Sequence, residues 1–551
     1  MHLKSGAGLE IGMNDRQSFT RSAGILMAVS SLPSHYGIGS FGKEAYRFVD
    51  FVKQSGHKYW QVLPLGPVTY GDSPYQSFSA FAGNPYYIDL DTLAEEGLLT
   101  KSFLLSIDWG DGIVPVNISE NEAAGFNFET ADRDIKYGDS AYVSYEKIYK
   151  GKYKALKKAF EKFISEYSIM NNNGYTSLGD YFKEYNMYKN DNREWLDDYA
   201  LFMAVKGKFD NVNWSEWDDD IRTRTPEGIC KYNEMLSSDI ECWKFLQFEF
   251  DRQWSRLKKY ANDNRIEIIG DIPIYMGYDS VDVWADTGEY QLDEKLKPVN
   301  VAGVPPDAFS DLGQKWGNPL YDWDKMEQNN FSWWRRRMQR SAKLYDVIRI
   351  DHFIGIVKYY SIPADMPDAR NGVYKEGPAG RFTNVINEAI GDKKIIAEDL
   401  GVSIYEVDKL LEENNYPGMK VLAFAFSGDR RNPHLPFNYK KNCVAYGGTH
   451  DNETLKGYFA EHPDYELVYA KQYLDEEEPD KMIDEAFRAA YSSVADIVIF
   501  SVQDILHLGN YARMNAPSTI GSNWKWRLLP GQLTQQHAEK LKYLVSIYGR
   551  E

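Results

Sequence analysis

Short apolar runs that alternate with helix-like segments constrain the fold of this chain more than any other feature. Eight runs have the length and the β-branched content of buried strands. They lie at residues 23–30, 59–65, 266–274, 346–353, 393–399, 419–426, 443–449 and 495–501. Eight strands that alternate with helices predict an α/β fold, a (β/α)8 (TIM) barrel. A doubly wound open sheet has the same alternation, and periodicity alone does not separate the two.

Several of the segments between these runs have helical periodicity. Between residues 42 and 56 the apolar side chains fall on one stripe, and Gly56 supplies a C-terminal stop. Further helices are predicted at residues 243–264, 332–345, 403–415, 480–492 and 535–548.

One gap breaks the alternation. About 200 residues separate the second and third runs, far more than a connecting loop needs. Within the gap, residues 140–210 are rich in Tyr, Lys, Glu and Asp at helical spacing. We therefore expect a large, mostly helical insertion at 85–240 over one face of the barrel, which comprises 21–84 and 241–551 and carries smaller loop insertions. Residues 1–20 are polar and mixed, and they predict a flexible leader.

The charge, the apolar content and the cysteine count of the chain limit which kinds of partner and compartment we expect. The formal net charge of −18 argues against binding to nucleic acid or to an anionic membrane surface. The longest apolar runs are strand-sized, and the first residues lack the apolar core of a secretory signal. Three cysteines without a CxxC motif favour a reducing, cytoplasmic setting over a disulfide framework or a metal motif.

Charged residues gather where four of the predicted strands end. The stretch VIRIDHF (347–353) begins as a buried strand and then places Arg349 and Asp351 on one face, with His352 on the other in a structural role. The other strand ends hold Asp271, Glu398, Asp399, His450, Asp451 and Glu453. Each acid alone could cap a turn or a helix. Because the active site of a parallel barrel lies at the carboxyl ends of its strands, their coincidence predicts a site.

Three kinds of chemistry could use such a cluster. Glycoside cleavage needs one carboxylate as nucleophile and another carboxyl group, held protonated, as general acid. Converging carboxylates also bind divalent metal ions, and hydrolysis by Ser or Cys is a third kind, although the sequence holds no GxSxG elbow. A guanidinium beside a carboxylate favours its ionised form and repels a metal ion. The Arg349–Asp351 pair therefore favours glycoside chemistry.

Ten longer motifs lie along the chain. They are GILMAVSSLPSHYGIGSFG (24–42), WQVLPLGP (60–67), GDSPYQSFSAFAGNP (71–85), GDIPIY (270–275), GVPPDAFSDLGQKWGNPLYDW (303–323), RIDHF (349–353), AEDLG (397–401), PGMKVLAFAF (417–426), GTHDNET (448–454) and NWKWR (523–527). In order and length they resemble the motifs of glycoside hydrolase family 77, the 4-α-glucanotransferases called amylomaltase or disproportionating enzyme. The resemblance covers residues 21–98 and 243–550.

The resemblance assigns roles to the acids. It implies that Asp351 is the catalytic nucleophile, that Glu398 is the general acid/base, and that Asp451 is the third carboxylate, which stabilises the transition state. The chain departs from the family where Ile354-Gly355 replaces the usual Arg-Gly after RIDHF, and this departure removes no catalytic group.

The resemblance also implies substrate-binding residues. Those that match the lining of the subsite for the cleaved sugar are Tyr75, Asp271, Arg349 and His450. The segment from Asp307 to Trp316 resembles a mobile loop over the acceptor side. Trp316, in a stretch at 303–318 rich in Gly and Pro, is the candidate platform for an acceptor sugar.

The implied activity is retaining transfer of α-1,4-glucan segments between maltooligosaccharide donors and glucan or glucose acceptors. It implies neither metal nor cofactor, and a monomer or homodimer in the cytoplasm. Three alternatives stay open: an α-glucan hydrolase with the same carboxylates, a metal-dependent hydrolase, and a non-catalytic glucan-binding module.

Overall fold

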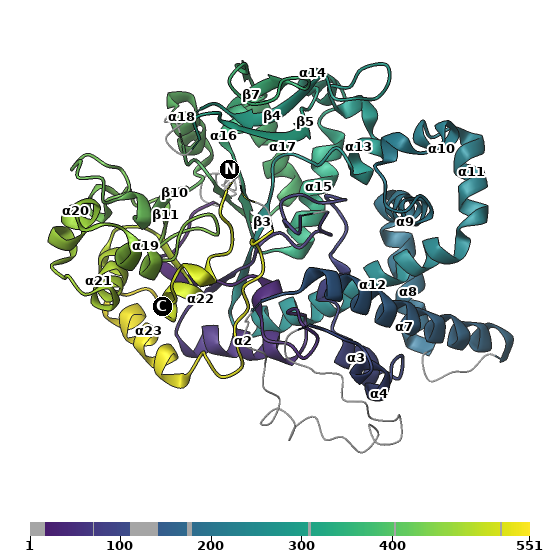
Figure 1. The fold of residues 1–551 in the computed structure, drawn as a ribbon, viewed down its shortest axis with the longest axis horizontal. Coiled ribbons are helices and arrows are strands. Elements are labelled where there is room, and N and C mark those ends of the chain that lie inside the picture. The colour runs from purple at the N-terminus through teal and green to yellow at the C-terminus, as the bar shows by residue number, and fades with distance from the viewer. Residues whose placement is uncertain are drawn as a thin grey trace, which may run out of the picture.

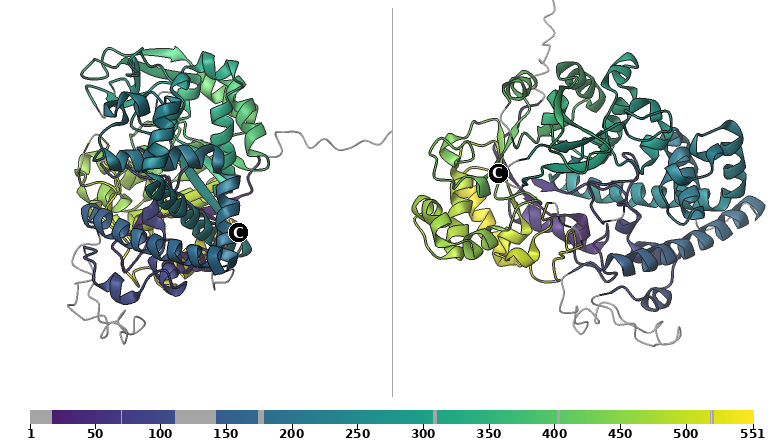
Figure 2. Two further views of the ribbon diagram at one scale, coloured as in Figure 1. Left: turned by 90° about the vertical axis from the view of Figure 1, so that its right-hand side faces the viewer. Right: turned by 45° about the horizontal axis from the view of Figure 1, so that its top comes forward.

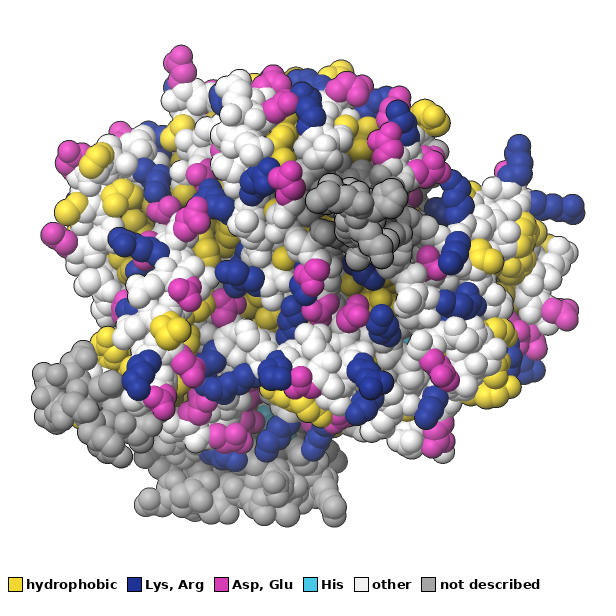
Figure 3. All heavy atoms as spheres, turned by 180° about the vertical axis from the view of Figure 1, so that it is seen from behind, with side chains coloured by type: hydrophobic (Ala, Val, Ile, Leu, Met, Phe, Trp, Pro, Cys, Tyr) yellow, Lys and Arg dark blue, Asp and Glu magenta, His cyan; other side chains and the backbone are white. Residues whose placement is uncertain are grey.

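The computed structural model describes residues 17–69, 71–110, 142–173, 179–306, 310–401, 404–517, 519 and 521–551. Of the predicted leader at 1–20, only the last four residues are among these. In the described part of the chain, no helix is long and apolar enough to cross a membrane. On the face shown in Figure 3, acidic and basic side chains are interspersed.

Eight parallel strands form the central sheet, as predicted (Figure 1). They are β1 (Ser22–Leu26), β2 (Tyr59–Gln61), β3 (Glu267–Ile272), β6 (Val347–Ile350), β9 (Lys394–Ala397), β10 (Gly418–Val421), β11 (Cys443–Tyr446) and β12 (Ile497–Ser501). Their spatial order follows the chain, from β1 through β9 on one side and from β12 back to β10 on the other. The Ala397 N–H donates to the Pro417 carbonyl at 3.1 Å, which joins the two ends of the sheet. The sheet is therefore a barrel and not an open doubly wound sheet.

Seven of the eight strands end before their apolar run does, because the carboxyl end of the run leaves the sheet, whereas β12 ends with its run at Ser501. The predicted strand at 346–353, for example, ends at Ile350. The residues that follow the strands form the loops at one rim of the barrel, where polar side chains collect.

Helices cover the outside of the barrel (Figure 2). The six predicted helices are present as α2 (Lys43–Gln54), α12 (Ser237–Asp263), α15 (Ser332–Leu344), α18 (Tyr405–Asn414), α21 (Pro479–Ser492) and α23 (Gln535–Ile547). Others, not predicted, are α13 (Val281–Ala285), α14 (Trp323–Gln328), α16 (Ile354–Val357), α17 (Gly380–Ile390), α19 (Leu455–Glu461), α20 (Asp464–Leu474) and α22 (Val502–Ile505). Short 3-10 turns are η1 (Val29–Ser31), η4 (Thr287–Glu289), η5 (Leu422–Phe424), η6 (Pro436–Asn438) and η7 (Asn510–Ala512).

The long connection from β2 to α12 is mostly helical. Its elements are η2 (Pro85–Tyr87), α3 (Leu90–Glu95), α4 (Lys101–Leu105), α7 (Tyr145–Asn173), α8 (Gly179–Asp191), α9 (Arg193–Lys208), η3 (Trp214–Glu216), α10 (Asp219–Arg222) and α11 (Pro226–Met235). Helices α7 to α11 lie together at one side of the barrel (Figures 1 and 2). An ion pair links helix α9 to the loop after β3, because the ammonium group of the buried Lys206 donates to the partly exposed Asp279 at 2.6 Å.

A second, antiparallel sheet was not predicted. Its strands β4 (Asn300–Val304), β5 (Gln314–Pro319), β7 (Lys358–Pro363) and β8 (Val373–Glu376) lie in the order β5-β4-β7-β8. The loop predicted from Asp307 to Trp316 is therefore wrong in part, since residues 314–316 belong to β5, which forms a β-hairpin with β4. Backbone pairing of β4 with both β5 and β7 explains why the two ends of the Gly- and Pro-rich stretch at 303–318 form strands.

Candidate active site

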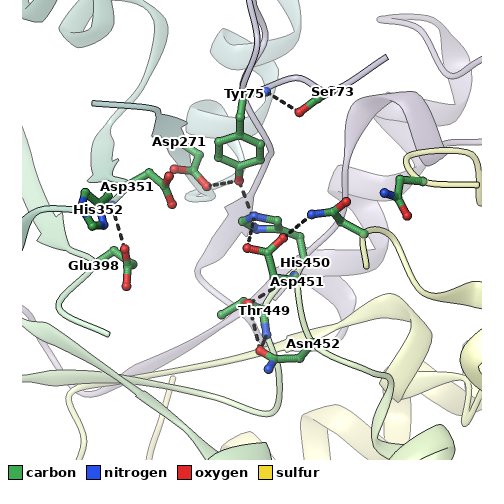
Figure 4. A network of polar contacts seen from close by, with 12 residues as sticks. Ser73, Tyr75, Asp271, Asp351, His352, Glu398, Thr449, His450, Asp451 and Asn452 are labelled. Carbon is green, nitrogen blue, oxygen red and sulfur yellow. Dashed lines mark hydrogen bonds and ion pairs between the residues drawn. The ribbon is translucent and has the colours of Figure 1, made fainter. Parts of the chain in front are cut away.

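The predicted strand ends meet at the carboxyl rim of the barrel (Figure 4). Asp271 lies in β3 opposite Arg349 in β6, and Asp351 follows β6 directly. Glu398 follows β9 directly, and Asp451 lies in the loop between β11 and α19. Because neighbouring strands are parallel and in register, their ends deliver these side chains to one place.

Arg349 is shared between two carboxylates. Its Nη1 donates to both oxygens of Asp271, at 2.6 and 2.7 Å, and to Oδ1 of Asp351 at 3.0 Å. The predicted Arg349–Asp351 pair is present, but Asp271 is the closer partner. The Arg349 side chain is 3% exposed and that of Asp271 is 0% exposed, whereas that of Asp351 is 27% exposed. Of the two carboxylates bound to Arg349, Asp351 is thus the one that a substrate can reach.

A continuous chain of polar contacts connects Asp351 to Asp451. Beyond Asp271, the Tyr75 hydroxyl donates to Oδ2 of Asp271 at 2.8 Å. The Nδ1 of His450 lies 3.0 Å from the same hydroxyl oxygen, and its Nε2 lies 3.4 Å from Oδ2 of Asp451. The rings of Tyr75 and His450 stack with centroids 4.6 Å apart. Since the hydroxyl hydrogen goes to Asp271, the Tyr75 oxygen accepts from His450.

The electrostatics of His450 and Asp451 agree with this chain. Burial lowers the pKa of His450, but the adjacent Asp451 carboxylate outweighs burial, so that pKa is raised above its usual value. Burial alone would raise the pKa of Asp451. His450 and the hydrogen bond from Asn515 outweigh that effect and lower the pKa of Asp451 to about 2. Asp451 is therefore an anion throughout the neutral range, and it lies beside an imidazole whose pKa is raised.

Glu398 has the opposite character. Its side chain is buried, and its two oxygens accept the backbone N–H groups of His352, at 2.7 Å, and Leu400, at 2.8 Å. These bonds fix the orientation of the carboxyl group and favour the anion. Burial and the negative charge of Asp351 are stronger, and they raise the pKa of Glu398 to about 8. Glu398 can therefore carry a proton at neutral pH.

The prediction that His352 points away from the site assumed that the strand continues to residue 352, and this assumption is wrong. That prediction continued the strand alternation past residue 350, whereas β6 ends at Ile350. His352 has a left-handed backbone, with φ of +52°. Its ring packs edge-to-face on Trp316, with centroids 4.9 Å apart, while its N–H binds Glu398.

Trp316, on β5, connects the antiparallel sheet with the site through contacts of its indole ring. The indole is partly exposed and contacts the rings of both His352 and Tyr275. Its Nε1 donates to Oε1 of Gln314 at 3.1 Å, which fixes the ring orientation. Asp307, the other residue predicted from this stretch, lies outside the described residues.

Sequence reasoning missed two residues that hold Asp451. The Asn515 amide donates to Oδ1 of Asp451 at 2.6 Å, and the Arg513 guanidinium donates to its backbone carbonyl at 2.7 Å. From the other side, Thr454 caps α19 by accepting from the Gly457 N–H, which ends the loop. Asn515 and Arg513 belong to an irregular segment after α22, where no periodicity indicates a direction. The only sequence signal for this segment is that it lies close to the NWKWR motif in the chain.

Metal binding was one of the alternatives for this cluster. Across the described parts of the chain, no three His, Cys, Asp or Glu side chains are grouped so that they could hold a metal ion. The acids of the site are instead engaged by Arg349, Tyr75, His450 and Asn515.

Comparison with known proteins gives consistent matches. The family model described as 4-alpha-glucanotransferase, glycoside hydrolase family 77, matches residues 27–534. A 4-alpha-glucanotransferase from Clostridium butyricum is 46% identical over 530 residues, which cover 95% of this chain and 100% of that protein. One from Thermus thermophilus is 40% identical, with 96% and 99% covered. The structure of an amylomaltase from Streptococcus agalactiae in complex with acarbose superimposes with a TM-score of 0.83 at 38% identity, covering 96% of this chain and 99% of that one.

Proposed function

This chain belongs to the 4-alpha-glucanotransferases of glycoside hydrolase family 77, enzymes that act on α-1,4-glucans, and we propose that it works by a retaining double displacement on Asp351. The donor is a maltooligosaccharide, and the acceptor is the 4-hydroxyl of another glucan or of glucose. In the first step, Asp351 attacks the anomeric carbon and Glu398 protonates the departing glycosidic oxygen. In the second step, Glu398 removes the proton from the acceptor hydroxyl, which displaces Asp351.

One observation carries this assignment: two neighbouring carboxyl groups have unlike surroundings. Asp351 is partly exposed and accepts from Arg349, whereas Glu398 is buried with its pKa raised to about 8. A retaining mechanism needs this difference between nucleophile and acid. It also predicts that the two carboxyl groups lie about 5–5.5 Å apart.

The same surroundings account for the change of role of Glu398. The negative charge of Asp351 is one of the causes that raise the pKa of Glu398. When Asp351 becomes an ester to the sugar, that charge is lost, and the pKa of Glu398 falls. The group is therefore an acid before the intermediate forms and a base afterwards.

Asp451, with Tyr75 and His450, would bind the hydroxyl groups of the cleaved sugar. Asp451 is anionic and held from three sides, so it is preorganised for the positive charge that develops on the ring in the transition state. Arg349 and Asp271 hold Asp351 and Tyr75 from behind. Their buried side chains would support the subsite, whereas the partly exposed Asp351 would face the reacting sugar.

Transfer must compete with hydrolysis, although water is present at roughly 55 M. Positioning provides the bias, because a correctly bound acceptor has an effective concentration far above that of bulk water. The partly exposed indole of Trp316, fixed against His352, is the proposed platform for the acceptor sugar.

Incubation with maltotriose tests the proposal. We expect glucose together with a series of longer maltooligosaccharides, resolved by chromatography or mass spectrometry, and no effect of a metal chelator. The Asp351→Asn variant should lose transfer by several orders of magnitude while its circular dichroism spectrum stays unchanged. Products that are only shorter than maltotriose would identify a hydrolase. Full activity in Asp351→Asn would refute the nucleophile.

A further inference from the structure

Trp524, in the NWKWR motif, has an unusual backbone for a bulky residue. Its φ is +64°, in the left-handed region that favours glycine, and its side chain is 5% exposed. Such a conformation persists only where the surroundings impose it, and it is found most often at functional sites. The catalytic mechanism proposed above assigns no role to any residue of this motif.

The Trp524 indole packs against the middle of the polar chain described above. Its ring centroid is 5.7 Å from that of Tyr75 and 5.8 Å from that of His450, with interplanar angles of 41° and 37°. Tyr75 and His450 themselves stack at 4.6 Å. The three rings therefore form one cluster, and the hydroxyl and imidazole of its two polar members join Asp271 to Asp451.

The backbone of Trp524 is held from two directions. Its N–H donates to the Met514 carbonyl at 2.6 Å, one residue before Asn515, which binds Asp451. Its carbonyl accepts the Tyr145 hydroxyl at 2.8 Å, and Tyr145 is the first residue of α7. The next residue, Lys525, accepts the Val143 N–H at 2.7 Å. The helical connection between β2 and β3 thus fixes the segment that carries the indole.

We propose that Trp524 is a positioning residue for transfer: it holds the Tyr75 and His450 rings in the orientation that the cleaved sugar requires. The left-handed backbone is what turns the indole toward the two rings while its amide groups stay bonded to Met514 and Tyr145. Because the indole is buried, it acts through these rings and does not touch the sugar. This inference rests on the proposed assignment of Tyr75 and His450 to the subsite of the cleaved sugar.

The chain offers a matched control two residues away. Trp526 is also buried, at 2% exposed, and belongs to the same motif. It pairs with Tyr142, and its carbonyl accepts the Ser31 hydroxyl at 2.8 Å. Among the described residues, the Tyr75 and His450 rings contact the Trp524 indole and not that of Trp526. Removal of either indole should lower thermal stability, but only removal of Trp524 should change the chemistry.

The first experiment compares Trp524→Ala and Trp524→Phe with Trp526→Ala and Trp526→Phe in the full chain, with maltotriose as substrate. For Trp524→Ala we expect kcat to fall about 10- to 100-fold with KM within about threefold, because small displacements of aligned groups cost that much in rate. Trp524→Phe, which keeps a ring, should recover most of the loss. Trp526→Ala should keep kcat within about threefold below its melting temperature. If Trp524→Ala does not fold, Trp524→Leu, which is apolar but cannot stack, takes its place.

The second experiment is a double-mutant cycle with Tyr75→Phe. If Trp524 acts through the Tyr75–His450 pair, the fall in kcat for the double variant should be clearly smaller than the product of the two single falls. Multiplied losses, or equal losses in Trp524→Ala and Trp526→Ala, would overturn the inference. A Tyr75→Phe variant with unchanged kcat would instead refute the subsite assignment itself, and a normal Trp524→Ala beside an impaired Tyr75→Phe would refute the positioning role alone.

Discussion

Arg349 illustrates how one side chain sets the chemistry of several others. A buried guanidinium is stable only when it is paired, and here it donates to two carboxylates, Asp271 and Asp351. The closer partner is buried and the more distant one is exposed, so the cluster leaves a carboxylate facing outward. For Glu398, burial and the charge of Asp351 outweigh the opposing charge of Arg349, and the pKa of the carboxyl group is raised.

The raised pKa of Glu398 predicts the pH dependence of kcat/KM for maltotriose. The general acid must be protonated, and its pKa of about 8 keeps it so through neutral pH. Activity should therefore fall about tenfold per pH unit above pH 8. A maltosyl fluoride donor, whose leaving group needs no proton, should largely lose this alkaline fall. An identical fall for both donors would contradict the assignment of Glu398 as the acid.

At the scale of residues, the sequence located the strand-end acids because apolar runs with charged ends are local patterns. Asp271, Asp351, Glu398 and Asp451 meet at one rim, as those patterns predict, while their catalytic roles stay predictions. The pattern could not show that Asp271 takes the larger share of Arg349. Nor could it identify Asn515, since a contact across 64 residues between two irregular loops leaves no periodicity.

At the scale of elements, the β4–β5 hairpin was the least predictable part near the site. Strand β4 (NVAGV) is a short apolar segment and β5 (QKWGNP) is mostly polar, so no long apolar run or alternation marks the pair. Its order comes from pairing with β7, about 60 residues later, which no local pattern specifies. The division of the chain into a barrel and an insertion at 85–240 also stays a prediction.

Gly303 gives a test of this element. A Cβ atom there would lie 2.1 Å from the Gln314 carbonyl oxygen and 2.5 Å from the Ile362 side chain, so β5 would have to move. Since β5 carries Trp316, Gly303→Ala should raise KM for a glucose acceptor about 5- to 10-fold and lower the ratio of transfer to hydrolysis. Gly288→Ala, where no atom lies within 4 Å, is the control. An unchanged acceptor KM would contradict the placement of the acceptor beside Trp316.

At the scale of the whole molecule, the end of the chain stabilises the barrel far from the site. The buried Arg550 donates to the carbonyls of Ser22, Tyr491, Ser493 and Ala495. Ser22 begins β1, and Ala495 lies two residues before β12, at the rim opposite the active site. The barrel itself was predictable from eight local runs. The hydrogen bond from Arg550 to Ser22 was not, because it joins residues more than 500 positions apart.

Arg550→Ala should therefore destabilise the protein without changing its chemistry. Loss of a buried cation that satisfies four carbonyls should cost roughly 2–4 kcal/mol of unfolding free energy, measured as a lower melting temperature and urea midpoint. Below the melting temperature, kcat and KM should match those of the parent. The exposed Arg431, replaced by alanine, should leave the melting temperature unchanged. Equal effects of the two replacements would contradict the role assigned to Arg550.

The central claim is that Asp351 becomes covalently bonded to the sugar while Glu398 supplies and removes the proton. The most direct measurement uses Glu398→Gln with α-maltotriosyl fluoride, because this donor needs no acid and the variant lacks the base that discharges the intermediate. We predict that peptide mass spectrometry finds a maltotriosyl group on Asp351. A sugar attached to Asp451 or to another residue, or no adduct together with product of inverted configuration, would contradict the account.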